Sequence, residues 1–329
     1  MNNPITIRCH ESNHDQKSVI MGGAILMIML FHSGVLRFGE IGVDIFLFLS
    51  GYGLFFSLER NSKKTVFYRK RLLRILPTYL IVAVPYFIVH SNSVSEFLLR
   101  LSTLSVLTKG DLGGWWFIGI ILVCYLIAPF LYNILSRKNL CFWGLVIYIP
   151  LSILVARKFY TTEIMIYRMP SFFCGMIYAS LGFSLPCTIK GKGLINKVPS
   201  TFISIFTCLG ILILLYYAID RFWTYRHLMM CICSVPLVLS ISVIMSNLTG
   251  YIRKIFVFLG GITLELYMVH EYIAQCIAEK YLSIYNIGTQ ISTLSTTCVG
   301  IALAVTLAIL LNHIISILNT NILLCHKKK

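Results

Sequence analysis

Long uninterrupted apolar stretches are the feature that most constrains what this chain can fold into. Nearly all of its 329 residues fall into stretches close to the length, about 20 residues, at which a helix crosses the hydrocarbon core of a bilayer. Charged residues make up only 12% of the chain, whereas a soluble domain has about 25%. Continuous apolar runs are typical of helices, because the strands of a membrane barrel alternate apolar and polar residues. The sequence therefore predicts an all-α integral membrane protein.

Ten such stretches predict a bundle of about ten transmembrane helices. They cover residues 19–36, 41–58, 76–89, 115–135, 140–155, 164–182, 201–219, 228–246, 255–277 and 291–318. A further apolar stretch, 94–107, is too short to span and is predicted to be an interfacial or re-entrant segment. Little length is left for a soluble domain.

The formal net charge of +16 is distributed unevenly along the chain. If the N-terminus is cytoplasmic, most Lys and Arg residues fall on the cytoplasmic side, as the positive-inside rule requires. We therefore expect both termini in the cytoplasm, with a tail at 1–18, a transmembrane domain at 19–318 and a basic tail at 319–329. Because topology accounts for most of the basic excess, we expect membrane lipid rather than nucleic acid as a partner.

The densest basic segment follows the second predicted helix and is expected to be a loop. Seven cations lie between Arg60 and Arg74. Topology does not require so many in one loop, so the surplus predicts an anionic partner. Lipid headgroups and a phosphorylated ligand are both candidates.

Ionisable residues inside the predicted spans include His32, Asp44, Glu265 and His270. Such groups are costly in lipid unless they face a cavity or a partner, so they mark candidate functional positions. With a rise of about 1.5 Å per residue, the two histidines reach the same depth, about 20 Å from the cytoplasmic edge. Asp44 belongs to the same outer half, and Glu265 lies near the midplane. The simpler alternative is that each residue is a polar contact between packed helices.

This set of residues fits general base catalysis. A histidine can take a proton from a sugar hydroxyl at neutral pH, and a nearby carboxylate would orient the ring and stabilise the imidazolium. An anionic donor held by the basic segment could pass a thin pantetheine arm into the bundle toward His32. A cytoplasmic donor would then serve an acceptor on the far side.

Metal binding is not expected. Cys9, His10 and His14 have a spacing found in metal sites, but they lie in a short polar tail without an obvious fourth ligand. The 11 cysteines lie mostly within apolar runs and form no CxxC pair, so disulfides are not expected either.

Several short motifs occur in order along the chain. They are His32 followed by Gly34, then 42–46 (GVDIF), 49–52 (LSGY), 67–79 (FYRKRLLRILPTY), 115–117 (WWF), 168–175 (RMPSFFCG) and 266–270 (LYMVH). Together they resemble membrane acyltransferase family 3, over about residues 17–315. The resemblance implies a ten-helix bundle that moves an acyl group, usually acetyl, from acyl-CoA to a hydroxyl of an envelope or lipid-linked glycan. It implies acetyl-CoA as the donor, and we expect a bacterial-type plasma membrane as the location.

The resemblance also implies roles for individual residues. His32 matches the family's first-helix histidine, taken as the catalytic base, and we group Asp44, Glu265 and His270 with it by depth. The basic motif suggested to bind the donor is matched by Arg69, Arg71 and Arg74.

The first helix departs from the family pattern at one position. Many members have an arginine eleven residues before the histidine, where this chain has Met21. A first-helix arginine is therefore not available for donor binding, and Lys17, one turn earlier, could replace it.

Three further residues are candidates for binding the acceptor. Trp115 and Trp116 begin the fourth predicted helix, where a sugar could stack on them, although aromatic residues are common at this level in any case. Arg168 could bind an acceptor carboxylate or phosphate, or it could extend its charged end to the interface.

A transporter or flippase of a glycan or an anionic metabolite is the alternative class of function. In such a protein the buried histidine and glutamate residues would form a proton relay. The chain shows no internal repeat, which argues mildly against a transporter of two related halves. The acceptor sugar, the acyl length and the oligomeric state leave no readable mark on the sequence.

Overall fold

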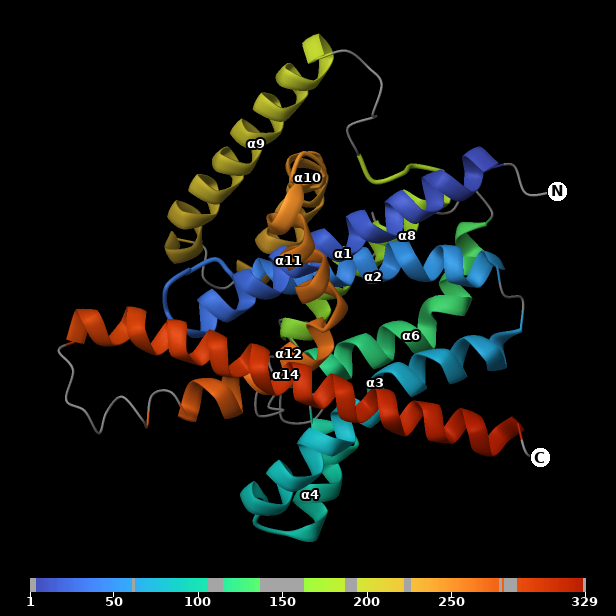
Figure 1. Ribbon diagram of the computed structural model, residues 1–329, viewed down its shortest axis with the longest axis vertical. Helices are drawn as coiled ribbons and strands as arrows, with labels where there is room; N and C mark the ends of the chain where they lie inside the picture. The colour runs from blue at the N-terminus through green and yellow to red at the C-terminus, as the bar shows by residue number, and fades with distance from the viewer. Residues whose placement is uncertain are drawn as a thin grey trace.

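The computed structural model describes residues 4–60, 63–105, 115–136, 163–186, 194–221, 226–277, 280 and 289–327. Regular structure in these ranges is helical throughout (Figure 1), which confirms the all-α prediction for them. The helices are α1 Pro4–His32, α2 Ile41–Arg60, α3 Lys64–His90, α4 Val94–Leu101, α6 Trp116–Leu135, α8 Glu163–Ser180, α9 Leu194–Arg221, α10 Arg226–Ser246, α11 Gly250–Gly261, α12 Thr263–Val269, the π-helix η3 His270–Gln275, and α14 Thr289–Lys327.

Six helices of the described residues are long and apolar enough to cross a membrane. They are Ile41–Arg60, Lys64–His90, Trp116–Leu135, Thr201–Ala218, Arg226–Ser246 and Ser295–Leu318. These six overlap the second, third, fourth, seventh, eighth and tenth predicted spans, and the third is longer than predicted because it begins at Lys64. The first and sixth predicted spans lie in α1 and α8, which are not among the six, and the fifth, 140–155, lies outside the described residues. The protein is a multi-pass membrane protein.

Helix α1 differs from its predicted bounds at both ends. It begins at Pro4, within the segment expected to be a polar tail, and ends at His32 rather than Leu36. The chain turns back after His32, because the N–H of Leu36 donates to the Leu30 carbonyl at 3.0 Å. Gly34 within this turn has a φ of 76°, a conformation that favours glycine. His32 is therefore the last residue of α1.

From Lys64 onward the basic segment is helical, and the prediction of a loop is wrong for that part. Helix α3 begins at Lys64, so Arg69, Arg71 and Arg74 lie on its first three turns. Arginine, lysine and leucine, which dominate this segment, are good helix formers. At about 1.5 Å per residue, Arg74 lies about 15 Å along the helix from Lys64. These guanidinium groups therefore extend from a rigid element.

The ninth predicted span, 255–277, is interrupted, and the prediction of one continuous helix is wrong. Helix α11 ends at Gly261, α12 begins at Thr263, and the backbone changes to a π-helix at His270. Non-helical backbone at membrane depth is tolerated where it is buried in protein or lines a cavity. Short π-helical segments are frequent at functional sites.

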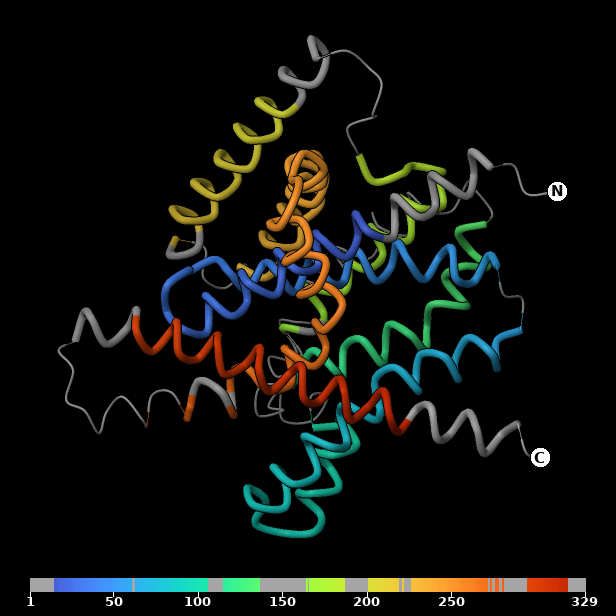
Figure 2. The backbone as a smooth tube through the Cα atoms, in the orientation of Figure 1, coloured from blue at the N-terminus to red at the C-terminus, as the bar shows by residue number. Residues whose placement is uncertain are grey.

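The helices around these breaks form the main bundle. Helix α2 packs against α8 and α1, while α1 packs against α11. Helix α4 projects away from the other helices (Figure 2). Helix α4 falls within the segment predicted to be interfacial or re-entrant.

Local side-chain contacts define the start of α4. Ser93 is its N-cap, and the Ser93 hydroxyl accepts a hydrogen bond from the Glu96 N–H at 3.2 Å. Hydrogen bonds from the Asn92 N–H and from Arg100 hold the pKa of Glu96 below its ordinary value. Residues that follow α4 line a cavity described below.

Helices α2 and α8 approach most closely where each has a glycine. Gly51 of α2 faces the backbone carbonyl of Phe172, and Gly175 of α8 faces that of Phe48. A Cβ atom at either glycine would overlap the facing carbonyl. Small residues allow such close contact between helix backbones in membranes. This crossing fixes the distance between two helices that contribute buried charges.

We expect Gly175→Leu to destabilise the protein strongly, because overpacking a tight contact costs about 1–3 kcal/mol or more. Gly210→Leu on α9 is the matched control, since a side chain there would enter open space. Thermal unfolding in detergent should show a clearly lower midpoint for Gly175→Leu only. Equal midpoints for the two variants would contradict the close crossing.

Candidate active site

Two histidines far apart in the sequence meet at the end of α1. Nε2 of His270 lies 2.9 Å from Nδ1 of His32. His270 is only 5% exposed, whereas the side chain of His32 is 22% exposed. The structure thus brings together the two imidazoles that the depth argument placed at one level, and it leaves one of them accessible.

Backbone carbonyls fix the protonation pattern of this pair. Nδ1 of His270 lies 2.9 Å from the carbonyl oxygen of Tyr267 and 3.2 Å from that of Leu266. Because a carbonyl oxygen can only accept, Nδ1 of a neutral His270 holds the proton and its Nε2 is an acceptor. His32 must then donate through its Nδ1–H. In the neutral pair, the nitrogen of His32 that has no proton is Nε2.

Glu271 is the carboxylate beside this unprotonated nitrogen. Its Oε2 lies 3.5 Å from Nε2 of His32, and its side chain is 31% exposed. A carboxylate at this distance would stabilise an imidazolium at His32. The sequence analysis missed Glu271 and grouped Asp44 and Glu265 with the histidines. The structure instead pairs those two carboxylates with arginines.

Arg168 is the centre of a second polar cluster. It is fully buried, and its two Nη atoms donate to Asp44 and to Glu40 at 2.5 Å each. The Ser171 hydroxyl donates to the other oxygen of Asp44 at 2.9 Å, and Nδ1 of His227 lies 3.0 Å from Nη2 of Arg168. The cluster therefore links α2, α8 and α10. Binding of an acceptor by Arg168 stays a prediction.

Arg74 and Glu265 form a third pair. Glu265 is fully buried on α12, and its Oε1 lies 3.3 Å from Nη1 of Arg74. The Thr78 hydroxyl donates to the same oxygen at 3.4 Å, and Nη2 of Arg74 donates to the Gly261 carbonyl at 3.2 Å. The side chain of Arg74 is still 47% exposed. One guanidinium thus joins a buried carboxylate to an accessible surface.

An inner cavity of about 140 Å³ lies between α1, α2, α3, α6, α11 and α12. Arg74 is the charged residue of its lining, and the other polar residues are Ser50, Tyr125, Thr263 and Tyr267. Much of the remaining lining is apolar and includes Met21, Ile28, Phe46, Phe117 and Leu264. Ile28 precedes His32 by one helical turn on α1, so the cavity extends from the Arg74 guanidinium to the level just below the histidine pair.

Met21 and Lys17, the two first-helix positions compared with the family pattern above, lie at or near the inner cavity. Met21 lines the inner cavity and makes its wall apolar where an arginine is usual. The ammonium of Lys17 occupies the space that the missing side chain of Gly53 leaves free, close enough to Arg71 for the two charges to interact. Lys17 therefore lies at the basic end of the bundle interior.

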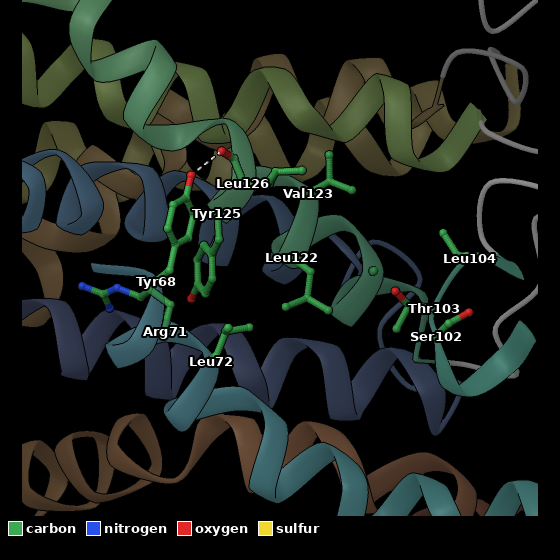
Figure 3. A pocket seen from close by; sticks show the side chains of 11 residues that line it. Tyr68, Arg71, Leu72, Ser102, Thr103, Leu104, Leu122, Val123, Tyr125 and Leu126 are labelled. Carbon is green, nitrogen blue, oxygen red and sulfur yellow. Dashed lines mark hydrogen bonds between the residues drawn. The ribbon is translucent and has the colours of Figure 1, made fainter. Parts of the chain in front are cut away.

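A larger cavity of about 370 Å³ lies between α3, α6 and the residues that follow α4. Figure 3 shows Arg71 and the phenol rings of Tyr68 and Tyr125 at one end and Ser102 and Thr103 at the other. Leucine side chains lie between the two ends (Figure 3). The cavity is thus a mainly apolar space with a cation at one end.

The three arginines predicted to bind the donor have different surroundings. Arg71 donates from Nη2 to Ser57 at 2.8 Å, and its Nε is buried without a hydrogen-bond partner. Arg71 faces the larger cavity and Arg74 the inner one, whereas Arg69 is exposed. Arg71 and Arg74 are therefore better placed than Arg69 to meet a ligand that enters the bundle.

The two tryptophans make packing contacts. Trp115 is 2% exposed, and its Nε1 donates to the Met268 carbonyl at 3.2 Å, which anchors the start of α6 against α12. The guanidinium of Arg168 lies 5.3 Å from the ring centre of Trp116. A role for either ring in stacking on a sugar stays a prediction.

The fold and these clusters define a multi-pass membrane protein with acid–base groups in its interior. The chain belongs to acyltransferase family 3: the family described as "Acyltransferase domain" matches residues 20–313, a range that includes both histidines and both cavities. This match confirms the family resemblance of the motifs.

Comparison with individual proteins adds a short match. A protein of Komagataeibacter xylinus, named as the membrane-bound transacylase BcsY, is 40% identical to this chain over 63 residues. The match covers 18% of this chain and 16% of that protein. No solved structure matches the chain.

The residues that the sequence analysis missed are partners of those it found. Glu40 and His227 surround Arg168, and Glu271 contacts His32. One signal was available, because an arginine inside a predicted span requires a carboxylate partner. Which carboxylate it would meet depends on helix packing.

We expect Arg168→Leu to destabilise the protein, because it leaves the buried Asp44 without its cation and leaves Glu40 with the longer contact to Arg226, at 3.7 Å. Breaking a buried ion pair costs about 3–5 kcal/mol. Arg100→Ala on α4, which disrupts a partly exposed pair with Glu96, is the control and should have little effect on unfolding in detergent. A stable Arg168→Leu variant would rule out this packing role.

Proposed function

We propose that this protein is an O-acyltransferase that moves an acyl group, most often acetyl, from cytoplasmic acyl-CoA to a hydroxyl of an envelope or lipid-linked glycan. The proposal includes ten spans, cytoplasmic termini and a bacterial-type plasma membrane. The first turns of α1 and the last turns of α14 lie on one side of the bundle (Figure 1), which is consistent with an even number of spans.

The donor would enter from the side on which α3 begins. Arg71 and Arg74, with Lys17 nearby, would bind the phosphates of coenzyme A. The pantetheine arm and its thioester would occupy the inner cavity, which extends from Arg74 to Ile28. Its volume of about 140 Å³ suits a thin chain with a small acyl group better than a long acyl chain.

His32 would act as the general base. Its Nε2 takes the proton of the acceptor hydroxyl, and the resulting oxygen attacks the thioester carbonyl. The C–S bond breaks, the ester forms, and the proton passes to the leaving thiolate. The hydroxyl and the thioester are thus converted into an ester and free thiol.

His270 and Glu271 would support this step. The carbonyls behind His270 determine which nitrogen of His32 is unprotonated, and Glu271 lies beside the imidazolium that forms. The single observation that favours this proposal most is the pattern of hydrogen bonds that leaves Nε2 of an accessible His32 unprotonated, one helical turn above the cavity.

We expect His32→Ala to reduce acyl transfer by about 10²–10⁴-fold, the usual contribution of a general base. Membranes supplied with labelled acetyl-CoA should transfer label to cell-surface glycan in the wild type and in the control His90→Ala, but not in His32→Ala. Unchanged labelling in His32→Ala together with loss of solute uptake would instead support a transporter or flippase.

We expect Arg71→Gln and Arg74→Gln to raise the apparent KM for acetyl-CoA by about ten- to a hundred-fold, because each removes a charge-assisted contact. The KM for the acceptor should change little. Arg69→Gln should have a smaller effect, since Arg69 is exposed and lines neither cavity. An unchanged donor KM in both interior variants would remove this segment from donor binding.

A further inference from the structure

His32, His270 and Glu271 form a cluster that can hold a metal ion. Each residue offers one ligand atom, and the three atoms lie within 4.8 Å of one another. The expectation of no metal came from the sequence, where His32 and His270 are 238 residues apart and no spacing motif joins them. We propose that this trio is a binding site for Zn²⁺.

The orientation of His270 suits a metal ligand. A histidine that binds a metal through one nitrogen usually donates its other N–H to a carbonyl or a carboxylate, which fixes the ring. Nδ1 of His270 already has carbonyl partners at 2.9 and 3.2 Å. Its Nε2 therefore presents a lone pair toward His32.

The distances require only a small adjustment. Ligand atoms about 2.0–2.1 Å from a tetrahedral Zn²⁺ lie about 3.4 Å from each other. The imidazole nitrogens that face each other are 2.9 Å apart, and the three ligand atoms lie within 4.8 Å of one another. A small separation of the two rings and a movement of the partly exposed Glu271 side chain would admit the ion.

The chemistry of the donor set favours zinc. Two imidazoles and one carboxylate form a common three-ligand set for Zn²⁺, with the fourth position left to water. His32 and Glu271 are 22% and 31% exposed, so the cluster lies at the edge of the packed interior. No second group of this kind occurs among the described residues.

Zinc in this site would replace the proton that the two histidines share. The Nδ1 proton of His32 must leave that nitrogen, because a coordinating nitrogen is unprotonated, and it shifts to Nε2 of the same neutral ring. The base nitrogen Nε2 then carries a proton and cannot take one from an acceptor. Binding does not depend on the proposed acyl transfer, whereas this reversible inhibition rests on it.

The test is titration of the purified full-length protein in detergent with ZnCl₂, measured by calorimetry. We expect one site in the wild type, with affinity at least about ten-fold weaker in Glu271→Gln and in His270→Ala. Glu271→Gln keeps the size of a partly exposed side chain, so it remains informative if His270→Ala does not fold. X-ray absorption should show two imidazoles in the wild type and one in His270→Ala.

Two controls separate this site from others. A Cys9→Ser, His10→Ala, His14→Ala variant should bind zinc as the wild type does, and so should His90→Ala. Absence of binding by the wild type, unchanged affinity in Glu271→Gln, or loss of binding in the tail variant would each overturn the proposal. Zinc binding without inhibition of acyl transfer would leave the site in place and count against His32 as the base.

Discussion

A charged side chain inside a membrane must find a partner, and this requirement determines how the helices of this protein fit together. Arg168 is buried with Asp44 and Glu40, Arg74 pairs with Glu265, and His32 contacts both His270 and Glu271. Each contact joins helices that are distant in the sequence. Because the loss of one partner leaves the other buried and unpaired, these contacts hold the bundle in one arrangement.

Much of the fold could be predicted from the sequence, because apolar runs of sufficient length leave few alternatives to membrane helices. Helix boundaries were less predictable where the hydropathy of a segment does not match its local structure. The segment with Arg69 and Arg71 is polar enough to suggest a loop, yet it is helical in the structure. The break after Gly261 falls inside an apolar run that shows no charge or proline at that point.

The candidate site was predictable in part. Depth along the predicted helices placed His32 and His270 at one level, because the rise per residue is constant. The contact partners of these residues were harder to assign, because depth in the membrane does not determine which helix faces pack together. Asp44 was grouped with the histidines by depth, but the close crossing of α2 and α8 at Gly51 places it against Arg168.

The interruption after Gly261 has an electrostatic consequence. A helix has partial negative charge at its C-terminal end and partial positive charge at its N-terminal end. Arg74 donates to the last carbonyl of α11, and Glu265 lies in the first turn of α12. Each member of the ion pair therefore meets a helix dipole of opposite sign. A continuous helix would have no ends at this position. The break therefore supplies the two partial charges that stabilise the buried ion pair.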